Sequence, residues 1–365
     1  MVGGAEVAMK EITGRISDVQ FDLVCAKLKP ELPMTEVIGN VTVHRVGFGT
    51  AADKVLLPML GAYRACRLAP ASEFPAVWSL MASFGGLAAL FYCWARPKTK
   101  LLLTLQEGDP LEHYAKRAGM FHFLHKKIFK RADAVQAISR FLGDWAVHMG
   151  FKGTPEIVPN GVNIEAFTGH LDEDRRVELR RRHGFNEEDV VLVTVSRLTF
   201  KNAIDDIVRA LEKLPDRFKL LVVGEGEERS ALEILVRSLK LESRVVFHGL
   251  ADHADLPDLL KASDIFVRPS RSEGLGNSFL EAMAAGVPVI GTNVGGIPDF
   301  LTDGETGMFC KPDEPDSIVT AVTRIADDTD LRTRLVTNGE RLVRERYAWD
   351  DIAGRMKDIL YELQS

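Results

Sequence analysis

Short runs of apolar residues alternate with amphipathic segments along most of the chain. The apolar runs, each predicted to be a strand, lie at 21–27, 99–105, 190–196, 218–224, 243–249, 264–269 and 287–292. The segments between them have the apolar periodicity of helices. Repeated alternation of strand and helix is typical of parallel sheets with helices on both faces. The pattern therefore predicts an α/β protein.

The 365 residues are enough for about two domains of ~150 residues each. Turn-forming proline, glycine and asparagine residues gather at 153–167, and a strongly charged helix is predicted directly after them. We place an N-terminal domain at 1–157 and a second domain from 158 onward. Two doubly wound domains would bind ligands outside the carboxyl ends of their strands, and we expect them to face each other across a cleft.

One segment has an alternative interpretation as a membrane span. Residues 76–95 (AVWSLMASFGGLAALFYCWA) carry no charge over 20 positions, which is long enough for a transmembrane helix. Gly85 and Gly86 divide this segment, and fully covered strands also read as continuous apolar runs. We favour a buried strand, a glycine turn and a buried helix.

The net charge of −6 is unevenly distributed. Residues 1–157 carry 19 basic and 14 acidic side chains, whereas the remainder carries 27 and 38. Halves with charges of +5 and −11 are expected to meet different partners. The four cysteines form no CxxC pair, which argues for a reducing compartment and against a disulfide framework or a zinc site.

Two cations follow the predicted strand at 190–196. Arg197 and Lys201 leave its carboxyl end in the segment RLTFK. A guanidinium binds phosphate with two hydrogen bonds and an ammonium acts as a point charge, so the pair suits a diphosphate. The alternative is a pair of solvated charges at the start of a helix, where cations are slightly unfavourable.

The stretch SRSEGLGNSFLEAMAAG at 270–286 places Glu273 and Glu281 on either side of a glycine turn and a helix start. Ser278 and Glu281 have the spacing of a capping box, which gives Glu281 a structural alternative. Glu273 follows the strand at 264–269 and precedes a helix N-terminus, which attracts anions. No capping pattern accounts for Glu273, so it is the stronger candidate for chemistry.

Together these segments resemble the retaining glycosyltransferases of family 4, which have the GT-B fold of two facing Rossmann-like domains. The closing segment YAWDDIAGRMKDILYEL resembles the family's terminal helix, which crosses back to the N-terminal domain. The resemblance thus places the second domain at 158–345 and this helix at 346–365. The motifs that carry it are EGLGNSFLE with its continuation AMAAGVPVIGTNVGGIPDFL, and VPNGVNIEAF, SRLTFKN, GEGEE and DGETG.

The resemblance implies a role for each candidate. Arg197 and Lys201 would grip the diphosphate of a nucleotide-diphosphate sugar, and Glu281 would hold the ribose hydroxyls. Glu273 would contact the transferred sugar and face the positive charge developing at its anomeric carbon. Cations and a helix dipole would stabilise the departing diphosphate, so neither a metal nor a cofactor is expected. The other donor-binding candidates are Gly276, Asn277 and Ser278, through their backbone amides, and Gly3 and Gly4.

The N-terminal half departs from the family pattern. GGAE at 3–6 resembles the glycine loop after the family's first strand, and we expect that strand to be absent because only two residues precede the loop. A family histidine is replaced by Gln106 in TLQEGD, and Gln106 or Glu107 is the expected substitute. Asn160 completes the acceptor-side candidates. The segment between Arg197 and Lys201 is also one residue shorter than in the family.

The hypothesis is a retaining, metal-independent hexosyltransferase that acts on a glycan or lipid-linked acceptor in envelope or surface polysaccharide synthesis. Two alternatives stay open: an epimerase or phosphorylase of the same architecture, and a catalytically inactive protein that binds nucleotide sugars. No pattern for nucleic-acid binding is present. A cytoplasmic location is expected, peripheral on the inner face of the cell membrane.

The membrane expectation rests on 120–132 (MFHFLHKKIFKRA), which interleaves aromatic and basic residues. A basic amphipathic helix of this kind can lie on an anionic membrane surface. The alternative is a helix that docks on its own sheet with a solvated basic face. Co-sedimentation with anionic but not neutral vesicles would support the membrane partner, and equal binding to both would contradict it.

Overall fold

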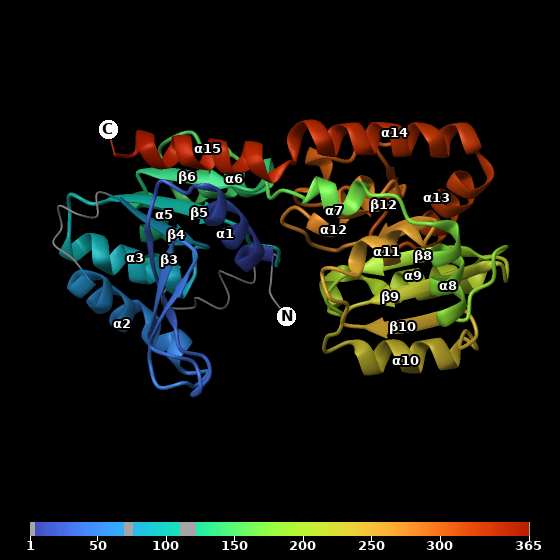
Figure 1. The fold of residues 1–365 in the computed structure, drawn as a ribbon, viewed down its shortest axis with the longest axis horizontal. Coiled ribbons are helices and arrows are strands. Elements are labelled where there is room, and N and C mark those ends of the chain that lie inside the picture. The colour runs from blue at the N-terminus through green and yellow to red at the C-terminus, as the bar shows by residue number, and fades with distance from the viewer. Residues whose placement is uncertain (1–3, 69–75, 110–121, 365) are drawn as a thin grey trace. The chain divides into compact units, whose positions relative to one another are not determined.

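The computed structural model describes residues 4–68, 76–109 and 122–364. The chain separates into two compact units (Figure 1). Unit 1 comprises Met1–Asn160 and Trp349–Ser365, and unit 2 comprises Gly161–Ala348. Both units are built from strands and helices in alternation, with sheets that are parallel apart from one hairpin, so the predicted α/β class is confirmed.

The described residues of unit 1 form two sheets. One has the order β1-β3-β2, in which β1 pairs parallel and β2 antiparallel to β3; the other is parallel throughout, with the order β4-β5-β6-β7. The strands are β1 (Phe21–Ala26), β2 (Thr35–Ile38), β3 (Val41–Val46), β4 (Ala76–Leu80), β5 (Lys100–Leu105), β6 (Ala134–Ala137) and β7 (Glu156–Ile157). The helices are α1 (Gly4–Arg15), α2 (Asp53–Leu68), α3 (Phe84–Ala95), α5 (His122–Arg131), α6 (Arg140–Met149) and α15 (Trp349–Glu362).

The uncharged segment at 76–95 forms β4 and α3, as predicted. Gly85 and Gly86, however, lie in the first turn of α3, and the chain turns before them, where Met81 has a φ of 64°. At 12 residues, α3 extends about 18 Å at the usual helical rise, well short of a bilayer. Among the residues that the structure describes, no helix combines the length and the apolar character needed to cross a membrane.

The C-terminal helix α15 packs within unit 1, beside the first helix of the chain (Figure 1). Trp349, Ile352 and Met356 share a buried cluster with Ala8 and Ile12 of α1. Burial of side chains of this size is worth roughly 1.5–3 kcal/mol each. The two ends of the chain are therefore joined through one apolar core.

Helix α5 docks on unit 1 by two fully buried residues, Ile128 and Phe129. Its Phe123 is about half exposed, and the Lys127 ammonium lies 5.5 Å from the centre of that ring. Residues 120 and 121 lie outside the described part of the chain. The helix thus combines a docked face with an exposed aromatic and basic face, and binding to a membrane stays a prediction.

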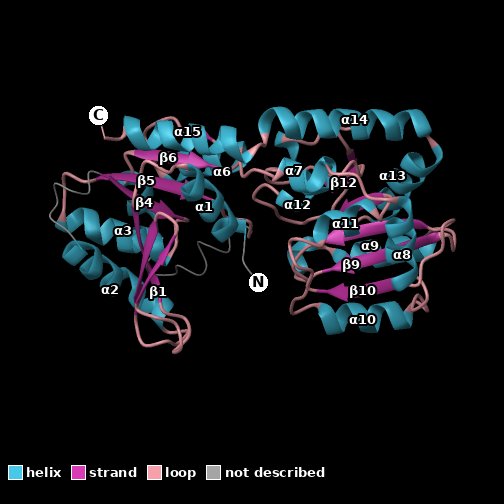
Figure 2. Cartoon of the chain, in the orientation of Figure 1, coloured by secondary structure: helices cyan, strands magenta, loops and turns pink. Residues whose placement is uncertain are grey.

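Unit 2 is built on one six-stranded parallel sheet with the order β10-β9-β8-β11-β12-β13, and helices pack around it (Figure 2). Its strands are β8 (Val190–Val195), β9 (Phe218–Val223), β10 (Val245–Gly249), β11 (Ile265–Arg268), β12 (Val289–Thr292) and β13 (Met308–Cys310). Its helices are α7 (Ile164–Thr168), α8 (Glu173–Arg182), α9 (Ile204–Lys213), α10 (Arg229–Ser238), α11 (Leu256–Lys261), α12 (Asn277–Ala284), α13 (Pro315–Asp327) and α14 (Thr329–Arg346).

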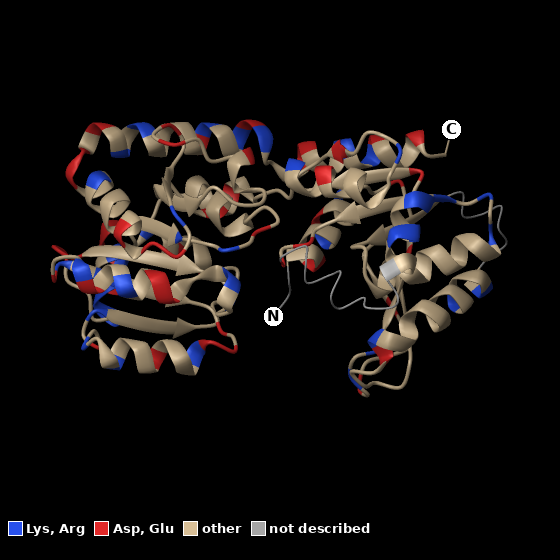
Figure 3. Cartoon of the chain, turned by 180° about the vertical axis from the view of Figure 1, so that it is seen from behind, with Lys and Arg blue, Asp and Glu red and all other residues tan. Residues whose placement is uncertain are grey.

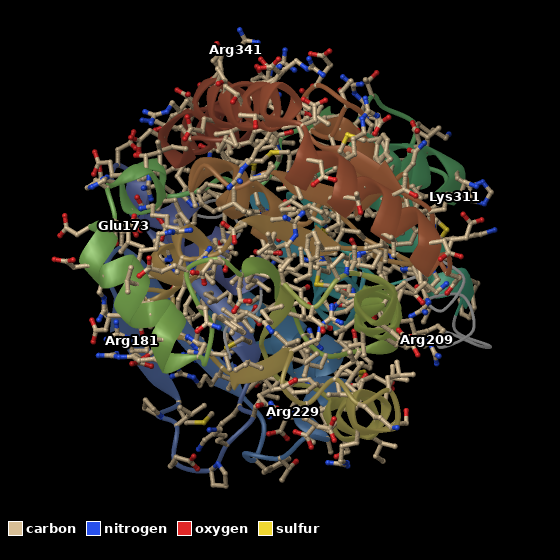
Figure 4. The ribbon with its side chains drawn as sticks, turned by 90° about the vertical axis from the view of Figure 1, so that its right-hand side faces the viewer. Glu173, Arg181, Arg209, Arg229, Lys311 and Arg341 are labelled. Atoms are coloured by element: carbon tan, nitrogen blue, oxygen red, sulfur yellow. The ribbon has the colours of Figure 1, made fainter. Side chains whose placement is uncertain are left out.

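Charged side chains lie mainly on the helices and connecting loops, and the strands are largely uncharged (Figure 3). Glu173 of α8 and Arg209 of α9, both labelled in Figure 4, are exposed. The interior of unit 2 is a continuous apolar cluster that includes Leu192 of β8 and Val267 of β11. A charged residue at the buried end of a central strand is therefore unusual in this unit and calls for a structural or functional reason.

Candidate functional site

The candidates of unit 2 lie on two loops that follow neighbouring strands. Strands β8 and β11 pair in parallel, so their carboxyl ends meet at the same edge of the sheet. Arg197 and Lys201 follow β8, whereas Glu273 follows β11 and precedes α12. The structure thus brings the two cations and the glycine-rich loop to adjacent strand ends.

Backbone contacts fix the loop that carries the two cations. The buried Asn202 side chain donates from its Nδ2 to the Arg197 carbonyl oxygen at 2.6 Å. The Arg271 amide donates to the Lys201 carbonyl oxygen at 2.7 Å, which joins this loop to the one after β11. The Arg197 side chain is exposed and that of Lys201 is half-buried. The main chain is therefore held in place while the Arg197 guanidinium stays accessible.

Arg271 strengthens the connection between the two loops. Its guanidinium donates to the Phe200 carbonyl oxygen at 2.7 Å and lies 4.3 Å from the centre of the Phe200 ring. Burial lowers the pKa of Arg271, but hydrogen bonds to Asp205 and Asp313 outweigh it and raise this pKa above its ordinary value. A network of several charges stabilises a fold more than an isolated surface ion pair does. The Arg271 network therefore helps to keep the two loops together.

Glu273 is nearly buried, with 8% of its surface exposed. Its Oε1 accepts from the Gly274 amide at 3.0 Å, and its Oε2 pairs with the guanidinium of Arg268. The Glu273 carbonyl oxygen accepts from the Gly296 amide at 3.2 Å. Gly295 has a φ of 55°, and any Cβ there would collide with that carbonyl oxygen. The carboxylate thus sits in a tightly packed loop that fixes its position.

Gly276 sets the start of α12. Its φ of 97° is in the left-handed region, and a Cβ would come within 2.8 Å of the Phe279 ring. Because Gly276 occupies the cap position, Ser278 is already the second helical residue, and α12 has no side-chain cap. The capping-box alternative for Glu281 is therefore wrong. Glu281 instead faces His253, whose Nε2 lies 3.5 Å from its Oε1.

Arg268 was missed by the sequence analysis. It is the last residue of β11, is only 7% exposed, and donates to the Ser278 hydroxyl at 2.7 Å. Burial lowers the pKa of Arg268 to about 10, and the charge of Glu281 acts in the opposite direction. The signal that could have revealed it is a charged residue at the end of an otherwise apolar strand, five positions before Glu273.

The acceptor-side candidates lie in unit 1, where Gln106 and Glu107 follow β5 and Asn160 follows β7. Asn160 is buried, and its Nδ2 donates to Gln106 Oε1 at 3.3 Å. The neighbouring Glu107 is 1% exposed, and its Oε1 accepts from the Ala82 amide at 2.7 Å. Its Oε2 has no hydrogen-bond partner among the described residues. A carboxyl group is thus enclosed beside the Gln106–Asn160 pair.

The glycine candidates of the N-terminus are not placed in a loop. Gly3 lies outside the described residues. Gly4 is the first residue of α1 and is exposed. The expected glycine loop is therefore wrong for Gly4, because the chain is already helical from this residue onward.

Glu107 predicts a pH dependence of stability in unit 1. Burial raises the pKa of Glu107 to about 7, although the Ala82 amide lowers it. A carboxyl whose pKa is raised on folding destabilises the native state as pH rises from about 4.5, its unfolded value, to about 7. Wild type should lose about 3 kcal/mol of unfolding free energy relative to Glu107→Gln between pH 4.5 and 8.

Urea unfolding followed by tryptophan fluorescence measures this difference, because all four tryptophans lie in unit 1. The control is the exposed Glu156→Gln of β7, which should leave the pH dependence unchanged. Parallel pH curves for wild type and Glu107→Gln would show that the Glu107 carboxyl does not titrate differently in the folded state. The tryptophans are Trp78, Trp94, Trp145 and Trp349.

Two family models match the chain. The model described as glycosyl transferases group 1 matches residues 175–342, and the model described as glycosyl transferase 4-like domain matches residues 3–161. The first match contains the whole of the β8–β11 site. The second contains Gln106, Glu107 and Asn160. Together the two matches include all candidate residues of both units.

Similar proteins point to the same family. An uncharacterised glycosyltransferase of Methanocaldococcus jannaschii is 35% identical over 206 residues, which is 55% of this chain and 53% of that protein. The N-acetyl-alpha-D-glucosaminyl L-malate synthase of Bacillus anthracis is 29% identical over 64% of this chain and 61% of its own length. A GDP-mannose-dependent monoacylated alpha-(1-6)-phosphatidylinositol monomannoside mannosyltransferase of Corynebacterium glutamicum is 30% identical over 64% of each. The chain thus spans between half and two thirds of the length of these relatives.

Solved structures share the fold. Sucrose-phosphate synthase from Thermosynechococcus elongatus superposes with a TM-score of 0.84 at 23% identity, over 99% of this chain and 94% of its own. Anabaena HepE in complex with UDP and glucose has a TM-score of 0.81 at 19% identity, over 99% and 97%. At these identities the likeness shows the arrangement of the chain and leaves the substrate open.

Proposed function

The chain belongs to the glycosyl transferases group 1 family, with a GT-B fold, and on this premise we propose that it is a retaining hexosyltransferase. The donor is a nucleotide-diphosphate sugar, and the acceptor is a hydroxyl group of a glycan or a lipid-linked saccharide. The observation that carries the proposal is the meeting of Arg197, Lys201 and Glu273 at the carboxyl ends of β8 and β11. Cations beside a carboxylate suit a ligand with a diphosphate at one end and a sugar at the other.

The reaction follows from the charges that change during it. The acceptor oxygen bonds to the anomeric carbon, the bond from that carbon to the diphosphate oxygen breaks, and the acceptor proton passes to the departing phosphate. Arg197, Lys201 and the amides at the start of α12 stabilise the negative charge on the leaving group. Glu273 stabilises the positive charge on the sugar ring. These groups need no metal ion to neutralise the diphosphate.

The setting proposed is envelope or surface polysaccharide synthesis on the cytoplasmic face of a membrane. It is supported by the mannosyltransferase relative from Corynebacterium glutamicum, whose name gives a phosphatidylinositol-linked acceptor. The exposed Phe123 and Lys127 of α5 offer an aromatic and basic surface of the kind that binds anionic headgroups.

A thermal-shift screen against UDP-, GDP- and ADP-sugars in EDTA tests donor binding. A donor at 100 times its Kd adds about 2.7 kcal/mol of stability, which raises Tm by roughly 5–10 °C for a unit of this size. We expect one nucleotide class to give this shift and the matching sugar to be hydrolysed slowly without acceptor. A shift with no turnover under any condition would favour the inactive binding protein, and no shift with any nucleotide would contradict the proposal.

A further inference from the structure

We propose that Arg268 is a positioning residue of the donor site, and that its buried positive charge holds the Glu273 carboxylate in place. The inference rests on the proposed function, because it assigns this carboxylate to a bound nucleotide sugar. In this role Arg268 does not touch the donor itself but fixes how Glu273 is presented to it.

The guanidinium of Arg268 is engaged by all three of its nitrogens. Its Nε donates to the Ser270 hydroxyl at 3.1 Å, one Nη donates to the Ser278 hydroxyl at 2.7 Å, and the other Nη pairs with Glu273 Oε2. The group also lies 5.3 Å from the centre of the Phe279 ring. One side chain thus joins the end of β11, the glycine-rich loop and the first turn of α12.

Strand geometry explains why an arginine can reach all three. Side chains alternate along β11, so Val267 enters the apolar cluster of unit 2 while Phe266 and Arg268 face the other way. The ring of Phe279 contacts both of them, at 5.0 Å from the Phe266 ring. Burying a guanidinium costs several kcal/mol unless hydrogen bonds and an opposite charge complete its surroundings. For Arg268 the hydrogen bonds and the opposite charge come from residues of the donor site.

The positive charge of Arg268 offsets part of the negative charge that gathers in the site. Glu273 and Glu281 lie one on each side of the start of α12, and a donor diphosphate would add further negative charge. Within the described part of the chain, Glu273 pairs with Arg268 from β11, and Glu281 pairs with His253 from the segment before α11. His253 is 58% exposed, so Arg268 is the buried countercharge. Without Arg268, the Gly274 amide would be the one partner left to the Glu273 carboxyl among the described residues, and burial would favour the neutral form of that carboxyl.

The alternative is a purely structural role, in which Arg268 holds the glycine-rich loop against α12. In that case its loss would lower stability and leave the chemistry of the folded protein intact. The two roles differ in the pH dependence of turnover, because only a countercharge keeps Glu273 ionised at lower pH. An opposite charge at this distance lowers a carboxyl pKa by about one to three units.

The test compares Arg268→Met and Arg268→Lys with Arg209→Met, an exposed arginine of α9 (Figure 4). Donor turnover is measured from pH 5 to 9 on the fraction that remains folded. Arg268→Met should lower kcat about 10-fold or more at pH 6 and move the acid limb of the kcat profile up by about one to three pH units. Arg268→Lys should recover part of both effects, because the charge remains, and Arg209→Met should match wild type.

A second measurement covers the case in which Arg268→Met does not fold. The double variant Arg268→Met/Glu273→Gln leaves neither charge buried alone, so its Tm should exceed that of Arg268→Met and stay close to that of wild type. Additive losses of Tm in the double variant, or a wild-type pH profile for Arg268→Met, would overturn the positioning role. If wild type binds donor without turning it over, the proposed function is wrong. The Tm comparison does not depend on turnover and still shows whether Arg268 and Glu273 act as a pair.

Discussion

Replacing Glu273 with glutamine is expected to lower kcat for donor turnover by about 10²–10³-fold, by analogy with the loss of one preorganised group from an oxyanion hole. Glutamine keeps the size of the side chain and a carbonyl oxygen but removes the charge that would face the sugar ring. Glu273 is held by the Gly274 amide and by Arg268, so the carboxylate needs little reorganisation during the reaction. An interaction made mainly in the transition state changes kcat more than KM.

The structure adds a cost in stability that the sequence did not predict. Glu273→Gln leaves the buried charge of Arg268 without its partner, and removal of one member of a buried pair costs up to about 3–5 kcal/mol. Turnover must therefore be expressed per folded molecule, at a temperature below both melting transitions. The control is Glu173→Gln on α8, at an exposed position (Figure 4). Wild-type kcat in folded Glu273→Gln would return Glu273 to a structural role.

Replacing Glu281 with alanine is expected to raise KM for the donor roughly 10- to 100-fold and to leave kcat nearly unchanged. A hydrogen bond to a charged group is worth about 1.5–3 kcal/mol, and a ribose contact persists from the bound donor to the transition state. The expected change in Tm is small, because Glu281 does not cap α12. Its contact with the exposed His253 is a pair of the kind that contributes about 0–1 kcal/mol.

Steady-state kinetics with varied donor, together with thermal melting, separates these effects. His253→Ala is the matched variant, since it removes the same contact and keeps the carboxylate, and it should retain a KM near that of wild type. A loss of Tm in Glu281→Ala with an unchanged KM would show that the carboxylate is structural after all.

The seven strands predicted from apolar runs all occur, each shifted by at most two residues at either end. They were predictable because central strands of a parallel sheet are buried on both faces and read as continuous apolar segments. The hairpin of β2 and β3 was missed because its strands include Glu36, Thr42, His44 and Arg45, which break the apolar run. Pairing with a neighbour, rather than local composition, makes those residues strands.

The sequence predicted which loops carry the site residues, but it did not predict the contacts that these residues make. Arg197, Lys201 and Glu273 could be placed because each follows an apolar strand, and strand order brings those ends together. The capping box failed because the positive φ of Gly276 moves the helix start, which spacing alone does not reveal. The Gln106–Asn160 contact joins residues 54 apart in the sequence and depends on the fold.

We expect this chain to transfer a sugar with retention of the anomeric configuration and without a metal ion. The most direct measurement is proton NMR of the first product formed from an α-linked nucleotide sugar and acceptor in EDTA. We expect an α-linked product, identified by its one-bond coupling constant between C1 and H1, formed at the same rate with and without EDTA. A β-linked first product, or turnover that EDTA abolishes and a divalent metal restores, would contradict it.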